Sequence, residues 1–388
     1  MQRGIATFTL DYGRCPPWLF ERMVKLGKSI TEVLVEEYGP EEFIKRIADP
    51  VWFQSLGTVL AFDWNASGLT TILTAALKEA IRFQEKDLGI FICGGKGKTS
   101  RKTPDEITTW GQRLNLQQAN INQFIYNSKM SAKVDSSLIQ DSYQIYHHAF
   151  FFTRSGAWTV VQQGMNTDTQ TARRYHWHSK DVKDFITEPH SGIASQITHQ
   201  SVLNMTDKQS AKTQTVSIEL LREGFKQIWH DLELLDKHQT KVSRVARVKI
   251  DGEPVTLAEY NDKDHLIVNN AAWDKPIGFE EFFNSPYLKK ILVKLAEQKP
   301  EDYERFLATE GVGPKTVRAL ALVAEVIYGA KPSYNDPARY SFAHGGKDAI
   351  PYPVDRPTYD ETIEILKDIV QKSKINVVEK DKILKRLR

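Results

Sequence analysis

A short glycine-containing stretch near the C-terminus constrains the fold of this chain more than any other feature. It consists of Gly311, Val312, Gly313, Pro314 and Lys315. The glycines permit a tight turn with a positive φ angle, and proline is favoured in the first turn of a helix because its missing N–H is not needed there. Apolar residues then recur at helical spacing up to Ile327. The sequence therefore predicts two helices joined by a tight turn, within residues 300–329.

The predicted turn has the chemistry of a phosphate-binding element. The first N–H groups of a helix have no partner inside the helix, and the helix dipole favours an anion in front of them. Such contacts hold a nucleic-acid backbone without reading its bases. We expect the DNA-binding residues of this segment to be Gly311, Val312, Gly313, Lys315 and Thr316. An ordinary helical hairpin with a glycine turn is the alternative.

The composition limits the class of protein. The formal net charge is only +3 over 388 residues, so a DNA contact must be local rather than spread over a basic surface. No apolar run is long enough to span a bilayer, and the first residues lack the apolar core of a signal peptide. Cys15 and Cys93 are too few for a disulfide framework. These features predict a cytoplasmic protein without a membrane partner.

The pattern of elements predicts a mixed α+β fold with two parts. Helical patterns broken at Gly27 and Gly39 are followed by an apolar strand at 88–93 and by an aromatic β-hairpin within 141–165. We expect residues 1–205 to form an α/β region that carries any catalytic site. Residues 206–388 then form a C-terminal, all-helical DNA-binding domain.

A loop rich in glycine and lysine follows the predicted strand at 88–93. A nucleotide-binding Walker loop requires a glycine five positions before Gly97, and Ile92 stands there. We therefore expect no ATP binding. Instead, the basic residues of this flexible loop are candidates for DNA phosphate contacts, with a solvated basic loop as the alternative. They are Lys96, Lys98, Arg101 and Lys102.

The aromatic segment also holds the candidate catalytic residues, which are Asp141, His147, His148, Gln162, His176 and His178. His176 and His178 lie on one face of a strand because side chains alternate. With a carboxylate they could hold a divalent metal that polarises a phosphate, although the spacing fixes no ligand set. Metal-free general base catalysis and filling of a half-buried sheet are the alternatives. Asp63 is either a further acidic candidate or a turn residue at a helix start.

Three strings resemble a single uncharacterised archaeal and bacterial family, known only as a domain of unknown function. They are Gly-Gly-Lys-Gly-Lys at 94–98, Val-Val-Gln-Gln-Gly-Met-Asn at 160–166 and Tyr-His-Trp-His at 175–178. This resemblance covers nearly the whole chain and implies no chemistry. Separately, residues 311–316 resemble the helix–hairpin–helix superfamily of DNA repair proteins, which includes nucleases, base-excision glycosylases and ligases. The second resemblance implies DNA, whether duplex, branched or damaged, as the partner.

Three functions follow as hypotheses. The first is a nuclease whose α/β region hydrolyses the phosphodiester backbone while the C-terminal part holds the DNA. The second is a glycosylase or lyase. The resemblance implies this because the base-excision glycosylases of that superfamily keep an essential Asp after the hairpin, and some of them use a Lys within it. Asp336 and Lys315 would fill these roles, although Asp336 precedes a proline and its offset differs by a few residues. The third is a DNA-structure-binding protein without catalysis.

Overall fold

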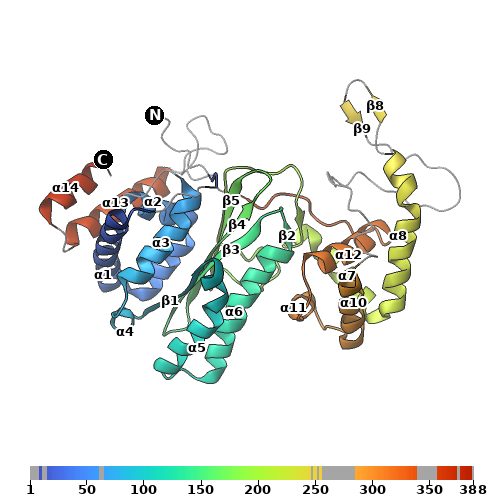
Figure 1. The fold of residues 1–388 in the computed structure, drawn as a ribbon, viewed down its shortest axis with the longest axis horizontal. Coiled ribbons are helices and arrows are strands. Elements are labelled where there is room, and N and C mark those ends of the chain that lie inside the picture. The colour runs from blue at the N-terminus through green and yellow to red at the C-terminus, as the bar shows by residue number, and fades with distance from the viewer. Residues whose placement is uncertain are drawn as a thin grey trace.

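The computed structural model describes residues 8–10, 15–60, 65–245, 248–250, 253–255, 285–338, 356–373 and 376–386. The centre of this described part is a five-stranded antiparallel sheet with strand order β1-β3-β4-β5-β6 (Figure 1). Its strands are β1 (Ile90–Lys96), β3 (Gln144–Thr153), β4 (Trp158–Asn166), β5 (Thr171–His178) and β6 (Gly192–Ser195). The predicted mixed α+β class is confirmed.

One face of the sheet is covered by N-terminal helices (Figure 1). These are α1 (Pro17–Ala48), α2 (Pro50–Val59), α3 (Ala66–Ala80) and the short α4 (Glu85–Leu88), with α13 (Arg356–Lys372) and α14 (Val377–Arg386) packed on their outer side. The predicted break at Gly39 is confirmed by its φ of 84°, but the break predicted at Gly27 is wrong. Helix α1 continues through Gly27 because this position packs against Leu60, Leu77 and Ala80. Packing overrides glycine's low helix propensity.

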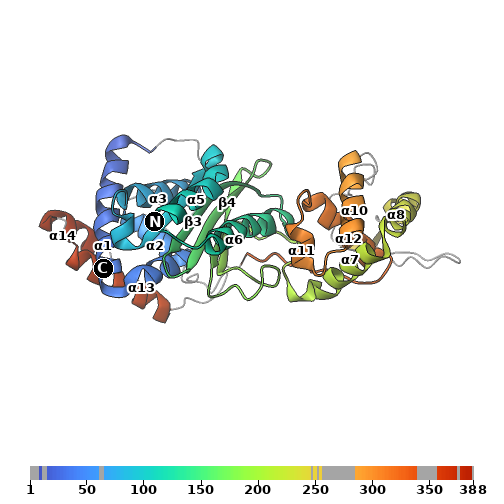
Figure 2. The ribbon, with the colours of Figure 1, turned by 90° about the horizontal axis from the view of Figure 1, so that it is seen from below.

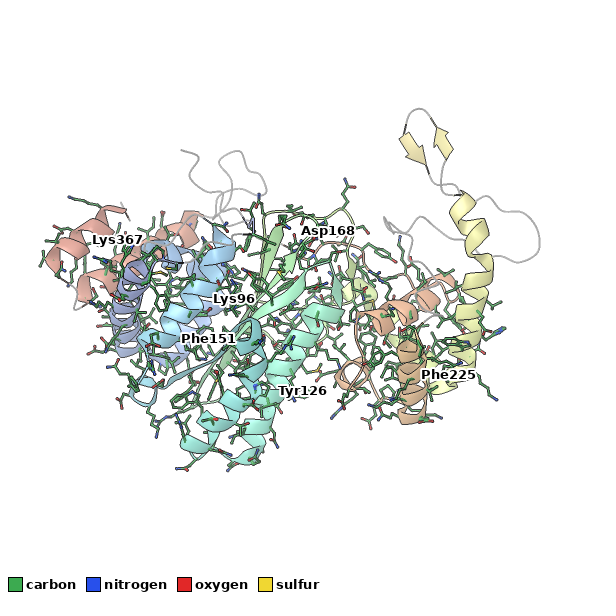
Figure 3. The ribbon with its side chains drawn as sticks, in the orientation of Figure 1. Lys96, Tyr126, Phe151, Asp168, Phe225 and Lys367 are labelled. Atoms are coloured by element: carbon green, nitrogen blue, oxygen red, sulfur yellow. The ribbon has the colours of Figure 1, made fainter. Side chains whose placement is uncertain are left out.

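The opposite face is covered by α5 (Thr103–Arg113) and α6 (Gln118–Ser137). The aromatic residues of β3 therefore contribute to two cores. Phe151 packs with the side chains of α1–α3, whereas Phe150 and Phe152 pack with those of α5 and α6. A strand with both faces buried reads as a continuous apolar run. Figure 3 places Phe151 within the central part of the molecule, among the strands.

A second group of helices lies beyond α6, at one end of the molecule in both Figure 1 and Figure 2. It consists of α7 (Ala211–Glu223), α8 (Phe225–Val245), α10 (Pro286–Gln298), α11 (Tyr303–Ala308) and α12 (Pro314–Val326). The hydroxyl of Tyr126 on α6 donates to Glu304 on α11 at 2.5 Å, and Figure 3 shows Tyr126 on this side of the sheet. The apolar side chains of these helices belong to the same core cluster as those between the sheet and helices α5 and α6.

Two departures from the predicted elements concern short strands. Residues 94–96 are not loop but the end of β1, because their pairing with β3 continues to Lys96, and η1 (Gly97–Lys102) is a 3-10 helix. The C-terminal part is not entirely helical, since β8 (Val248–Ile250) pairs with β9 (Glu253–Val255), where β-branched residues favour strands.

The remaining pair of short strands lies outside the main sheet. β2 (Ile139–Gln140) pairs with β7 (Leu203–Asn204), which precedes η2 (Lys208–Ser210). The domain boundary at 205/206 stays a prediction.

Candidate functional site

Residues 309–313 connect α11 to α12 by a tight turn. Gly311 has a φ of 97°, and a Cβ atom there would lie 2.3 Å from Ile291 Cδ1, so both conformation and packing demand glycine. Val312 is buried and anchors the turn in the core. Gly313 is different. Its backbone is extended, with φ of −151°, and an added Cβ would meet no atom within 4 Å. The protein itself therefore gives no reason for glycine at position 313.

Side chains of α6, α10 and β2 hold carbonyl oxygens of this segment and of Pro314, the first residue of α12. Lys133 donates to Thr309 O at 2.6 Å, and Lys294 donates to Glu310 O at 3.0 Å. Tyr287 donates to Gly311 O at 3.2 Å, and Gln140 donates to Pro314 O at 2.9 Å. Within the described part of the chain, by contrast, the N–H groups of Gly311 and Gly313 have no acceptor. The carbonyl oxygens of Thr309, Glu310 and Gly311 thus have side-chain donors, while the glycine amides in front of α12 remain available.

Cations surround the turn. Burial and, to a smaller extent, the nearby Lys294 lower the pKa of Lys133 to about 8, against an opposing effect of Glu310. Lys315 is exposed in the first turn of α12, and Thr316 beside it is buried. Neither Lys133 nor Lys294 could be placed here from the sequence, because each lies on another helix. Their contacts exist only after α6 and α10 have packed.

The other predicted DNA-binding segment lies elsewhere. Lys96 ends β1, and Lys98, Arg101 and Lys102 are exposed on η1. This 3-10 helix packs against β1, β3 and α5, whereas α11 and α12 pack against α6, α7 and other helices of the second group. Different elements therefore position the two basic segments.

The predicted catalytic histidines divide between the two faces of the sheet. On the face of α1–α3, His147 Nε2 lies 3.2 Å from Thr74 Oγ1 and His178 Nδ1 lies 3.0 Å from Thr159 Oγ1. His176 accepts a hydrogen bond from Arg174 Nε at 2.8 Å and faces Ile47 O at 3.1 Å. The side chains of all three histidines are buried. They line the interior of the protein rather than an open cleft.

Burial keeps these histidines neutral. Together with smaller effects of His148 and Lys96, it lowers the pKa of His147 to about 3. It also places the pKa of His176 well below its ordinary value, with Arg174 adding to the shift and Ile47 opposing it. Because Arg174 Nε–H donates to Nε2 of His176, the imidazole proton of His176 must reside on Nδ1, where Ile47 O accepts it.

The opposite face carries a buried polar network. Ser128 Oγ lies 2.9 Å from His148 Nε2, and His148 Nδ1 lies 2.8 Å from Gln162 Oε1. The amide of Gln162 donates to Asp135, which also accepts from Trp177 Nε1 at 3.0 Å and contacts His190 Nε2 at 2.5 Å. Sequence reasoning missed Asp135. The polar residues Ser128, Ser131 and Asp135 at helical spacing could have indicated a polar stripe on α6.

Asp141 and Asp336 meet at one buried arginine. Arg173 Nη1 lies 2.9 Å from Asp141 Oδ2, and Arg173 Nη2 lies 2.7 Å from Asp336 Oδ2. The Asp336 carboxylate also accepts from the backbone N–H groups of His199 at 2.7 Å and Ala338 at 2.9 Å. Burial raises the pKa of Asp141, and Arg173 opposes this shift. The geometry gives Asp336 a structural task, which is to tie the segment after α12 to β5.

The described residues contain no group of three or more His, Cys, Asp or Glu side chains placed to hold a metal ion. The candidate Asp63 lies outside the described residues. Within the described chain, no helix has both the length and the apolar character needed to cross a membrane. The catalytic roles predicted for Asp141, His147, His148, Gln162, His176 and His178 stay predictions.

Comparison with known proteins gives one match. No curated protein and no solved structure matches the chain. A family model described as "Protein of unknown function (DUF763)" matches residues 4–354. Since this match spans nearly the whole sequence, the chain belongs to the DUF763 family.

Proposed function

We propose that this protein binds DNA through its sugar–phosphate backbone, and that the turn between α11 and α12 is the binding element. In this proposal the segment is a helix–hairpin–helix. Phosphate oxygens accept hydrogen bonds from backbone amides at the start of α12, where the helix dipole favours an anion. The exposed Lys315 adds a cation at the same place. Contacts to the backbone alone give binding with little dependence on base sequence.

One observation carries the proposal, namely the asymmetry of the turn. Side chains of the protein hold three of its carbonyl oxygens and that of Pro314 at the start of α12, whereas the N–H groups of Gly311 and Gly313 find no acceptor among the described residues. The empty space beside Gly313 fits this arrangement, because a glycine without a Cβ lets another backbone approach closely.

The hydrolase and glycosylase hypotheses have less support than binding. His147 and His148 lie on opposite faces of the sheet and are both buried, and the Asp336 carboxylate is occupied by Arg173 and two backbone N–H groups. Strand-cleavage and base-release assays on branched and damaged DNA, with and without divalent metal ions, test these hypotheses separately from binding.

The Gly313→Val variant tests the proposed contact. A valine side chain at this position meets no protein atom at its Cβ, so folding stability should stay close to that of the wild type. The same side chain would occupy the space where a phosphate approaches. Loss of charge-assisted hydrogen bonds, each worth about 1.5–3 kcal/mol, predicts a fall in DNA affinity of about tenfold or more.

The measurement is fluorescence anisotropy with a labelled duplex, alongside thermal unfolding of both proteins. Gly313→Ala serves as the graded control, since its smaller side chain should cause a smaller loss of affinity. Equal affinity of wild type and Gly313→Val, with equal stability, would show that DNA does not approach this turn.

A further inference from the structure

A cavity of about 690 Å³ opens beside the edge strand β1, between α3 and α5. Its size falls within the range of small-molecule sites, which are concave, mostly apolar and equipped with a few convergent polar groups. Its apolar walls come from α3, α5 and the sheet, and include Ile72, Ala75, Ile92, Trp110 and Ala149. None of these residues belongs to the turn between α11 and α12, so the cavity is a separate feature of the molecule.

The edge of β1 presents backbone hydrogen-bonding groups to this cavity. Gly94 N donates to Glu106 Oε2 at 2.9 Å, and Gly94 O accepts from Lys78 Nζ at 3.1 Å. Both backbone groups of Gly94 therefore point away from β3. Along an antiparallel edge the outward groups recur at every second residue, so the N–H and C=O of Ile92 also point outward. Among the described residues no strand pairs with β1 on this edge of the sheet.

An outward N–H and C=O on one residue form a donor and an acceptor side by side. A nucleobase offers the complementary pair. The N1 and N6 positions of adenine, for instance, present an acceptor beside a donor on one edge of a flat apolar ring. The apolar walls beside Ile92 suit the faces of such a ring.

The other end of the cavity suits an anion. Lys96 lines it and is exposed, and within the described chain no carboxylate lies at ion-pair distance from its ammonium group. Thr99 adds a hydroxyl group there. Gly95 and Gly97 have φ angles of 147° and 59°, so the backbone beside Lys96 lacks Cβ atoms where a ligand would approach. Between the two ends, Lys78 and Glu106 form an ion pair of 2.6 Å.

From this geometry we propose that the cavity binds a nucleoside monophosphate unit. The base lies against the backbone of Ile92, and the phosphate lies beside Lys96 and Thr99. Lys96 and Ile92 are four residues apart on the same strand, which separates the two recognition points by about 13 Å at 3.3 Å per residue. The unit is either a free mononucleotide or an unpaired nucleotide of bound DNA. Only the second source rests on the proposed function.

Isothermal titration calorimetry with dAMP, deoxyadenosine and inorganic phosphate tests the cavity itself. We expect dAMP to bind more tightly than either fragment. Lys96→Ala should weaken dAMP binding about tenfold while leaving deoxyadenosine binding unchanged. Lys86→Ala is the matched control, because Lys86 is an exposed lysine of α4 that does not line the cavity, and the affinity of this variant for dAMP should equal that of the wild type.

A variant that fills the cavity provides a second test. Ala75 is exposed on α3 and lines the cavity, so Ala75→Trp should fill the space without disturbing the core and should abolish dAMP binding. A duplex with one unpaired 2-aminopurine tests the second source, since its fluorescence should change with wild type and not with Ala75→Trp.

The outcomes are distinct from those for the α11–α12 turn. Gly313→Val should still bind dAMP, so loss of DNA binding in that variant leaves the cavity proposal intact. No heat with dAMP together with no change in 2-aminopurine fluorescence would overturn the proposal. Binding that survives in Ala75→Trp would also overturn it.

Discussion

Replacing Arg173 with alanine is expected to destabilise the protein by about 3–5 kcal/mol, because it would leave two buried carboxylates without their cation. Arg173, Asp141 and Asp336 are all shielded from solvent, with side-chain exposures of 0%, 0% and 1%. Burial of an unpaired charge is costly, whereas the native arrangement gives each carboxylate an ion pair and further hydrogen-bond donors. The loss of stabilising contacts should be largest where the segment around Asp336 meets β5.

Urea unfolding monitored by circular dichroism measures this effect. Arg154→Ala is a suitable control, because Arg154 is exposed and its guanidinium donates to the carbonyl of Lys86 at 3.1 Å. A surface change of this kind usually alters the free energy of unfolding by no more than about 0.5 kcal/mol. If Arg173→Ala unfolds at the same urea concentration as Arg154→Ala, the cluster does not stabilise the fold as its geometry indicates.

Acidification from about pH 7 to about pH 5 is expected to cause the second large loss of stability. In the unfolded chain a histidine titrates near its ordinary pKa of 6.5, whereas in the native protein His147 has a pKa of about 3 and that of His176 lies well below 6.5. Above pH 6.5 both states hold neutral imidazoles, and the stability is fully present. Below it only the unfolded chain takes up protons, so stability falls progressively as pH approaches the native pKa values.

Urea titrations at several values between about pH 7 and about pH 5 check this expectation, since most exposed carboxylates remain ionised in that window. His147→Gln should reduce the slope of stability against pH, because the unfolded variant takes up one proton fewer. A free energy of unfolding that does not change across this window would contradict the neutral, buried state of these histidines.

Parts of this architecture could be predicted from local sequence. The turn at 311–313 is encoded by neighbouring residues, and glycine and proline act through their own backbone restrictions. The alternation that places His176 and His178 on one face follows from strand geometry alone. Both predictions needed no knowledge of distant residues.

The surroundings of the candidate residues could not be predicted in this way. Alternation assigns His147 and His148 to opposite faces, but it does not say that helices cover both faces. The pairing of Arg173 with Asp336 joins positions 163 residues apart, and no local pattern encodes such a contact. Gly94 and Gly95 indicated a loop, yet pairing with β3 extends the strand through them, because ladder hydrogen bonds outweigh glycine's weak strand preference.

The dependence of DNA affinity on salt concentration tests the central proposal most directly. Each phosphate neutralised by a cation contributes about −0.9 to the slope of log Kobs against log salt. Lys315→Gln should therefore make the slope less steep by about one unit. Lys331→Gln, an exposed lysine just beyond the other end of α12, should leave it unchanged. Equal slopes for wild type and both variants, or no DNA binding at low salt, would contradict backbone binding at this turn.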